Sequence, residues 1–142
     1  MLECLIIGDS ISNGIKSVMR DCVSLTEIGI SSEQWYRKNH SRPLLDMEDY
    51  LYTVISLGSN DSREDSGVWM QRIRDKVRSG RVIWILPSDT VKPQQRAIVE
   101  LAAAKNGDLV LSIKQWTGPD GIHPPTVRAY EQISNAIKDV KK

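Results

Sequence analysis

One apolar run that ends in a small polar turn sets the architecture of this chain: Leu2-Glu3-Cys4-Leu5-Ile6-Ile7-Gly8-Asp9-Ser10. Apolar residues at successive positions indicate a strand that is buried on both faces, as in a parallel sheet. Similar runs cover residues 52–57 and 82–86, and each is closed by a glycine or a proline. Two weaker runs, at 23–30 and 108–113, complete a set of five predicted strands.

Helical patterns alternate with these strands. Apolar residues recur at helical spacing, and we expect helices over residues 11–20, 65–79, 93–105 and 126–140. Residues 35–49 are less regular and predict helical turns that are broken at Pro43. Strands that alternate with helices favour an α/β fold in which helices cover both faces of a parallel sheet. We therefore expect one domain over residues 1–142, with three layers in the order α/β/α.

Polar residues follow four of the five predicted strands. Ser10 follows the first, Ser31-Ser32 the second, Asn60 the third and His123 the fifth. Ligands of parallel sheets bind at the carboxyl ends of the strands, and all of these residues fall on that edge. The pattern therefore predicts a single site there.

These residue types are the parts that a serine esterase needs. A serine hydroxyl can act as nucleophile, a histidine as its base, an aspartate as the group that orients the histidine, and an amide as a donor to the oxyanion. The chain carries them in the order Ser10, Asn60, Asp120, His123, within the words Gly-Asp-Ser, Gly-Ser-Asn-Asp and Asp-Gly-Ile-His-Pro. This order and these words resemble the SGNH (GDSL-type) hydrolase superfamily, over the span from Gly8 to Pro124.

The resemblance implies a role for each motif. Ser10 would attack the ester carbonyl, and its own N–H would help to hold the oxyanion, together with the side chain of Asn60. His123 would accept the Ser10 proton and Asp120 would fix the imidazole tautomer, so hydrolysis should rise with pH as His123 loses its proton. Asp9 is expected to brace the nucleophile turn.

The second motif of the family departs from its usual form. The family has a glycine after the second strand whose backbone N–H is a further oxyanion donor, whereas the corresponding turn here reads Gly29-Ile30-Ser31-Ser32-Glu33. By this alignment Ser32 takes the donor position, and Gly29 is the alternative. Two tryptophans near the motifs, Trp35 and Trp116, are candidates for substrate binding because indoles stack on sugars and line acyl pockets.

Each motif also has a structural interpretation. Asp9, Ser10 and Ser12 suit a helix N-cap, and an Asn-Asp pair such as Asn60-Asp61 can form an Asx turn. The serines at 31 and 32 can cap a helix at Glu33, and Trp35 and Trp116 can be core or rim residues. Asp61 is expected to organise its loop.

The fold implied by the resemblance is a flavodoxin-like, five-stranded parallel sheet with strand order 2-1-3-4-5. The implied activity is hydrolysis of short-chain acyl esters without a cofactor or a metal, with an O-acetyl carbohydrate or glycoconjugate as the favoured substrate. Two alternatives remain open: an acyltransferase or thioesterase that uses the same triad, and a non-catalytic domain that binds a glycan or a protein.

Composition and charge restrict the binding partners and the location that we expect for this protein. The 142 residues carry 19 basic and 18 acidic side chains, a net charge of +1 that argues against nucleic-acid or anionic-membrane binding. No basic segment precedes the first apolar run, which predicts a strand rather than a signal peptide and hence a cytoplasmic protein. Cys4 and Cys22 are expected to be small buried apolar residues in neighbouring strands. The sequence leaves the oligomeric state open.

Overall fold

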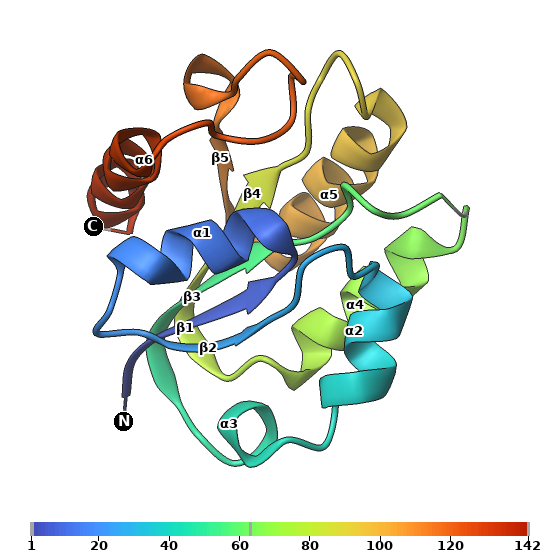
Figure 1. The fold of residues 1–142 in the computed structure, drawn as a ribbon. Helices are drawn as coiled ribbons and strands as arrows, with labels where there is room; N and C mark the ends of the chain where they lie inside the picture. The colour runs from blue at the N-terminus through green and yellow to red at the C-terminus, as the bar shows by residue number, and fades with distance from the viewer. Residues whose placement is uncertain (1, 63, 142) are drawn as a thin grey trace.

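The structure, a computed structural model that describes residues 2–62 and 64–141, is built around one five-stranded sheet (Figure 1). All neighbouring strands are parallel and their order is β2-β1-β3-β4-β5. The predicted fold class and strand order are therefore confirmed. The strands are β1 (Leu2–Gly8), β2 (Val23–Thr26), β3 (Tyr50–Ser56), β4 (Ser79–Leu86) and β5 (Leu109–Ser112).

Helices cover both faces of this sheet. Figure 1 shows α1 and α6 on one side, and α2, α4 and α5 on the other. The helices are α1 (Ser10–Val18), α2 (Ser32–Asn39), α3 (Pro43–Asp46), α4 (Ser66–Lys76), α5 (Pro93–Asn106) and α6 (Val127–Val140), with a 3-10 turn, η1, at Lys114–Trp116.

The alternation of side chains along each strand divides the core into two clusters. Leu5 and Ile7 of β1 point into the cluster beneath α2, α4 and α5. Cys4 and Ile6 point to the opposite face and pack beneath α1 and α6. Because successive side chains of a strand point to opposite faces, an uninterrupted apolar run is needed to fill both layers.

Several element boundaries differ from the sequence prediction. The predicted strand at 23–30 ends at Thr26, since Gly29 turns the chain with a φ of +77°. The helix predicted to reach residue 79 ends at Lys76, and β4 begins at Ser79. Gly80 thus lies inside β4 instead of ending a helix, at a place where an added Cβ would come within 3.0 Å of the Leu51 carbonyl oxygen.

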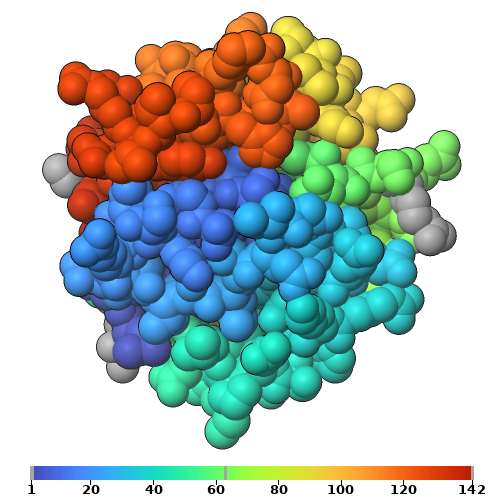
Figure 2. Space-filling view, viewed as in Figure 1, coloured from blue at the N-terminus to red at the C-terminus, as the bar shows by residue number. Residues whose placement is uncertain are grey.

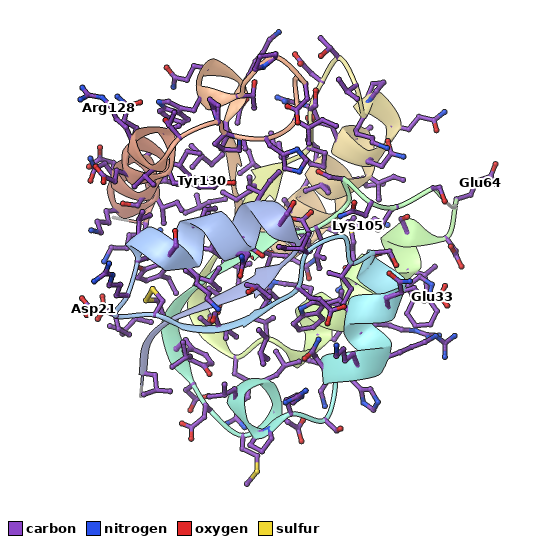
Figure 3. All side chains as sticks on the ribbon, viewed as in Figure 1. Asp21, Glu33, Glu64, Lys105, Arg128 and Tyr130 are labelled. Carbon is purple, nitrogen blue, oxygen red and sulfur yellow. A yellow bond between two sulfur atoms is a disulfide. The ribbon has the colours of Figure 1, made fainter. Side chains whose placement is uncertain are left out.

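The prediction for the two cysteines was wrong. Cys4 and Cys22 form a disulfide, with their Cα atoms 4.7 Å apart (Figure 3). The register of the two parallel strands explains the disulfide. Leu5 pairs with Val23, and Cys4 and Cys22 directly precede these two residues, so they lie opposite each other. Apolar burial alone did not reveal that the two thiols face each other.

None of the helices in the described part of the chain has the length and apolar character needed to cross a bilayer.

Candidate active site

Ser10 is presented at the junction of β1 and α1. Asp9 is the N-cap of α1, and its carboxylate accepts a hydrogen bond from the Ile11 amide at 3.1 Å. Ser10 is the first residue of the helix, so its N–H has no acceptor within the helix and is available to a ligand. The turn requires glycine at position 8, because φ is +138° there and a Cβ would lie 1.9 Å from the Ser56 carbonyl oxygen.

Ser10 is hydrogen-bonded to a histidine that lies far away in the sequence. The Ser10 Oγ is 3.0 Å from the His123 Nε2, and the His123 Nδ1 is 2.7 Å from the Asp120 Oδ2. The three side chains thus form one continuous hydrogen-bonded chain. When Asp120 is ionised, the protonated Nδ1 of neutral His123 donates a hydrogen bond to the carboxylate, and the unprotonated Nε2 can accept the Ser10 proton.

A tight turn holds Asp120 and His123 together. The Asp120 Oδ1 accepts hydrogen bonds from the backbone amides of Ile122 and His123, both at 2.9 Å. The amide of His123 contributes most, followed by that of Ile122 and the imidazole, and together they lower the pKa of Asp120 to about 2. Asp120 is therefore ionised at neutral pH.

Asn60 lies in the loop after β3, next to the turn that precedes α2. Its side-chain Nδ2 donates a hydrogen bond to the Ile30 carbonyl oxygen at 3.2 Å, and the side chain is otherwise exposed. An amide NH2 group has two protons, so one remains for a ligand. Gly8, at the end of β1, pairs with Ser56, at the end of β3. The segments that carry Ser10 and Asn60 therefore leave two adjacent strands at the same edge of the sheet.

Four segments meet at this edge. In Figure 2 the dark-blue start of α1 is bordered by the orange segment near residue 120, the green segment near residue 60 and the light-blue segment near residue 30. The four segments that follow the strand ends therefore lie together at one edge of the sheet, as the sequence predicted.

Ser32 does not offer its amide to this site. Its N–H donates to the Asp61 Oδ1 at 2.8 Å, and its Oγ donates to the Asp61 Oδ2 at 2.5 Å. The alignment that gave Ser32 the role of oxyanion donor is in conflict with this bond. Ser31 is the N-cap of α2, in a capping box with Gln34, as the structural interpretation predicted for this pair of serines. Gly29, the alternative donor, is exposed in the preceding turn.

The two candidate substrate-binding tryptophans have different positions. Trp35 is fully buried, and its Nε1 donates to the Leu25 carbonyl oxygen at 2.8 Å, so its predicted contact with substrate was wrong. Trp116 is half-buried in η1 against the core beneath α1 and α6.

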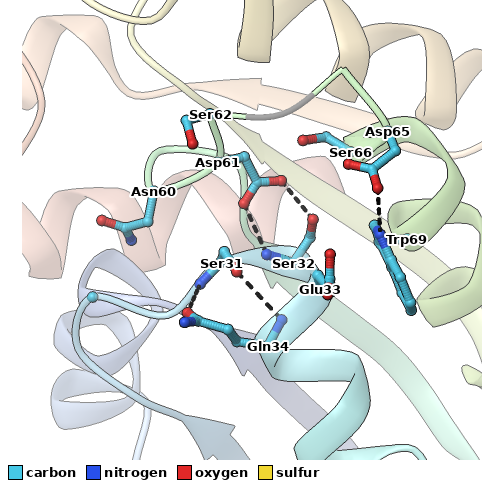
Figure 4. A pocket seen from close by; sticks show the side chains of 11 residues that line it. Ser31, Ser32, Glu33, Gln34, Asn60, Asp61, Ser62, Asp65, Ser66 and Trp69 are labelled. Atoms are coloured by element: carbon cyan, nitrogen blue, oxygen red, sulfur yellow. Dashed lines mark hydrogen bonds between the residues drawn. The ribbon is translucent and has the colours of Figure 1, made fainter.

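A cavity of about 370 Å³ opens beside Asn60 (Figure 4). Apart from Gly29 and Trp69, all of its lining side chains are hydroxyls, amides or carboxylates, including those of Ser31, Gln34 and Ser62. Trp69 is the aromatic side chain of this lining and is 9% exposed. Its position on α4 opposite the turn before α2 places it on this cavity, and only the tertiary structure reveals that. The other lining residues are Ser32, Glu33, Asn60, Asp61, Asp65 and Ser66.

A smaller cavity of about 210 Å³ borders the turn that carries His123. Gly121 and Ile122 form one wall, and the Ser88-Asp89-Thr90 loop after β4 forms another. Two basic side chains, Arg96 and Lys114, also line it.

Asp9 is a second acidic residue close to Ser10. It is fully buried, and its Oδ2 has no hydrogen-bond partner among the described residues. Its Oδ1 accepts from Ser56 Oγ at 3.3 Å as well as from the Ile11 amide. Burial raises the pKa of Asp9 to about 6.

Among the described residues, no three or more His, Cys, Asp or Glu side chains are grouped closely enough to hold a metal ion.

Comparison with known proteins identifies the fold. No protein-family model matches the sequence, and no curated protein matches it. Solved structures do match. A GDSL-like lipase from Bacteroides thetaiotaomicron superposes with a TM-score of 0.72 at 17% identity, over 98% of this chain and 87% of that one.

Two further structures are similar. A carbohydrate acetylesterase from Sinorhizobium meliloti gives a TM-score of 0.70 at 10% identity, with coverage of 98% and 97%. The catalytic domain of peptidoglycan O-acetyltransferase A from Streptococcus pneumoniae gives 0.64 at 18% identity, with coverage of 98% and 92%. The chain therefore has the SGNH (GDSL-type) hydrolase fold, as the sequence motifs predicted.

Proposed function

We propose that this protein is a serine-dependent ester hydrolase that cleaves short-chain acyl esters. The observation that carries the proposal is the continuous hydrogen-bonded chain from the Ser10 hydroxyl through His123 to the Asp120 carboxylate. A serine hydroxyl is a weak nucleophile unless a base removes its proton, and His123 is within hydrogen-bond distance to act as that base.

In the proposed reaction the Ser10 Oγ attacks the ester carbonyl while its proton passes to the His123 Nε2. Asp120 stabilises the imidazolium. The negative charge on the former carbonyl oxygen is met by the Ser10 amide and the Asn60 side chain; one such donor contributes about 3 kcal/mol of barrier reduction.

Collapse of the tetrahedral intermediate breaks the bond to the alcohol, which leaves with the proton from His123. Water then attacks the acyl-enzyme, with His123 again as base, and releases the acid and the free Ser10 hydroxyl. Water is the one co-reactant: its oxygen enters the acid, and the proton that His123 takes from it is returned to the Ser10 Oγ.

We propose that the alcohol part of the substrate is polyhydroxylated, with an acetylated carbohydrate as the first candidate. The cavity beside Asn60 supports this, because its lining consists mainly of side chains that hydrogen-bond hydroxyl groups. A long acyl chain finds little apolar surface there. The likeness to a carbohydrate acetylesterase points in the same direction.

The test is turnover of an aryl acetate and of acetylated sugars by the wild type and by Ser10→Ala. We expect the variant to lose nearly all activity and to lose labelling by a fluorophosphonate probe. Wild-type turnover in Ser10→Ala would refute the mechanism, and failure of the probe to label the wild type would favour a non-catalytic binding domain.

A transfer reaction is the second candidate, and the similarity to the O-acetyltransferase domain favours it. The same acyl-enzyme would then be attacked by a second alcohol or thiol in place of water. Product analysis with competing alcohols separates the two, since a transferase yields mainly the new ester and a hydrolase mainly the free acid.

A further inference from the structure

The Asp61 carboxylate binds Ser32 through both of its oxygens. Both of its oxygens accept hydrogen bonds from Ser32, one from the backbone N–H and one from the hydroxyl (Figure 4). Asp61 is 4% exposed and Ser32 1% exposed. A buried carboxylate is costly unless it is fully hydrogen-bonded, and these two bonds to a charged acceptor meet that need.

The residue type at position 32 is matched to this contact. A glycine there would supply the N–H but no hydroxyl, and one oxygen of the buried Asp61 carboxylate would be left without its partner. Ser32 thus ties the turn before α2 to the loop after β3 through both its amide and its hydroxyl.

Asp61 is itself held firmly. Its N–H donates to the Gly58 carbonyl oxygen at 3.0 Å, and its carbonyl oxygen accepts from the Gln95 side chain at 2.8 Å. The residue thus connects the loop after β3 with α5 on one side and the start of α2 on the other.

Asn60 contacts the same turn as its neighbour Asp61. While Asp61 binds Ser32, the Asn60 Nδ2 donates to the Ile30 carbonyl oxygen, two residues earlier. The Asp61–Ser32 contact therefore holds the same short turn that supplies the acceptor of the Asn60 amide.

We propose that Asp61 is a positioning residue for the oxyanion hole, acting through Ser32 to orient the Asn60 amide. The hole then has two donors, the Ser10 N–H and the Asn60 side chain, and Ser32 contributes by position only. This inference rests on the proposed esterase function, and its first measurement is independent of activity.

That measurement is the NMR signal of the Asn60 side-chain NH2 group in isotope-labelled protein, assigned by its loss in Asn60→Ala. We expect Asp61→Ala to move the two proton resonances of Asn60 towards each other and towards the values of a free amide. Ser32→Ala, which removes one of the two bonds, serves if Asp61→Ala does not fold. Unchanged Asn60 resonances in the folded variant would overturn the proposal.

The second measurement is a double-mutant cycle on kcat for an aryl acetate. We expect Asp61→Ala or Ser32→Ala to lower kcat by about 10-fold or more with KM within about 3-fold, and to lower it far less when Asn60 is already alanine. Equal factors in both backgrounds would overturn the proposal, whereas a wild type without Ser10-dependent turnover would refute only the proposed function.

A matched control is available in Asp108. This carboxylate is also buried, and it binds Arg74 at 2.7 Å and the Trp84 Nε1 at 2.9 Å on β4, away from the candidate site. Asp108→Asn should lower the melting temperature without moving the Asn60 resonances or kcat. A general loss of rigidity, in contrast, would change all three in both variants.

Discussion

The Ser10 Oγ and the His123 Nε2 lie 3.0 Å apart although 113 positions separate them in the sequence. The sheet makes this contact possible, because β1 and the segment after β5 deliver both residues to the same edge. His123 is exposed on its turn, so access of substrate does not require any part of the core to open.

The two histidines of the chain offer a sharp comparison. His123→Ala should lower kcat by about 10²–10⁴-fold, because the general base is lost while the fold remains. His40→Ala should leave kcat unchanged, since His40 is exposed and stacks on Tyr36 with ring centroids 5.1 Å apart. Steady-state kinetics with an aryl acetate provide the test, and equal effects of both changes would contradict the assignment of the base.

Asp120 should act through its charge at all working pH values. Its pKa is lowered to about 2, so the stabilisation of its turn is present above the ordinary value of 3.8 and is lost only as the pH falls towards 2. A decrease in activity between pH 5 and pH 7 must therefore come from another group. Asp120→Asn should lower kcat by roughly 10-fold or more without creating a new titration between pH 5 and pH 7. If the decrease in kcat on the acid side of the pH profile disappeared in this variant, the assignment of that decrease to another group would be wrong.

Asp9 should make the protein less stable as the pH rises. Burial raises its pKa from 3.8 to about 6, so its protonated form is favoured in the folded state; the stability this provides is complete below pH 3.8 and is lost as the pH rises through 6. The difference corresponds to about 3 kcal/mol. In Asp9→Asn the neutral amide should remove this dependence.

The measurement for Asp9 is denaturant unfolding of wild type and variant at pH 4.5 and pH 7.5. We expect Asp9→Asn to gain stability relative to the wild type between these two values, and titrations of all other groups cancel in the comparison. A constant difference between the two proteins would show that Asp9 does not titrate in this range.

Gly8 should be far less tolerant of substitution than Gly29. Both have positive φ, but a Cβ at Gly8 would lie 1.9 Å from the Ser56 carbonyl oxygen, whereas nothing lies within 4 Å of one at Gly29. Gly29→Ala should cost about 1 kcal/mol of unfolding free energy from φ alone, and Gly8→Ala about 3 kcal/mol or more because strands β1 and β3 must separate. Similar losses in chemical denaturation would contradict this ranking.

The sequence was informative wherever a local pattern determines the structure. The apolar run at residues 2–7, which is buried from Cys4 onward, needed two covered faces. The three-residue spacing of Asp120 and His123 already placed both side chains on one turn. Such features depend on residues that are neighbours in the chain, so they can be predicted from the sequence.

Features that depend on contacts between distant segments were harder to predict. The burial of Trp35 follows from how α2 packs on β2, and the capture of the Ser32 amide follows from the approach of Asp61, 29 residues further along. Neither partner is marked by a motif. The alignment of Ser32 with a donor glycine gave the right place in the fold but could not show which way the amide points.

The disulfide between Cys4 and Cys22 should contribute measurably to stability. It closes a loop with a sequence separation of 18 that contains the whole of α1 and the turn that carries Ser10. Loop-closure entropy predicts about 3 kcal/mol for a loop of this length. For a chain of this size that corresponds to a change in melting temperature of roughly 10 °C.

Thermal unfolding with and without a thiol reductant measures this contribution. The wild type should melt at a lower temperature after reduction, whereas a variant with Cys4→Ala and Cys22→Ala should melt at the same temperature in both conditions. Because Ser10 is also held by the pairing of β1 with β3 and by the α1–α6 contact, we expect reduction to leave kcat at 25 °C nearly unchanged. Two free thiols titrated in the unreduced, denatured protein would show that the bond does not form.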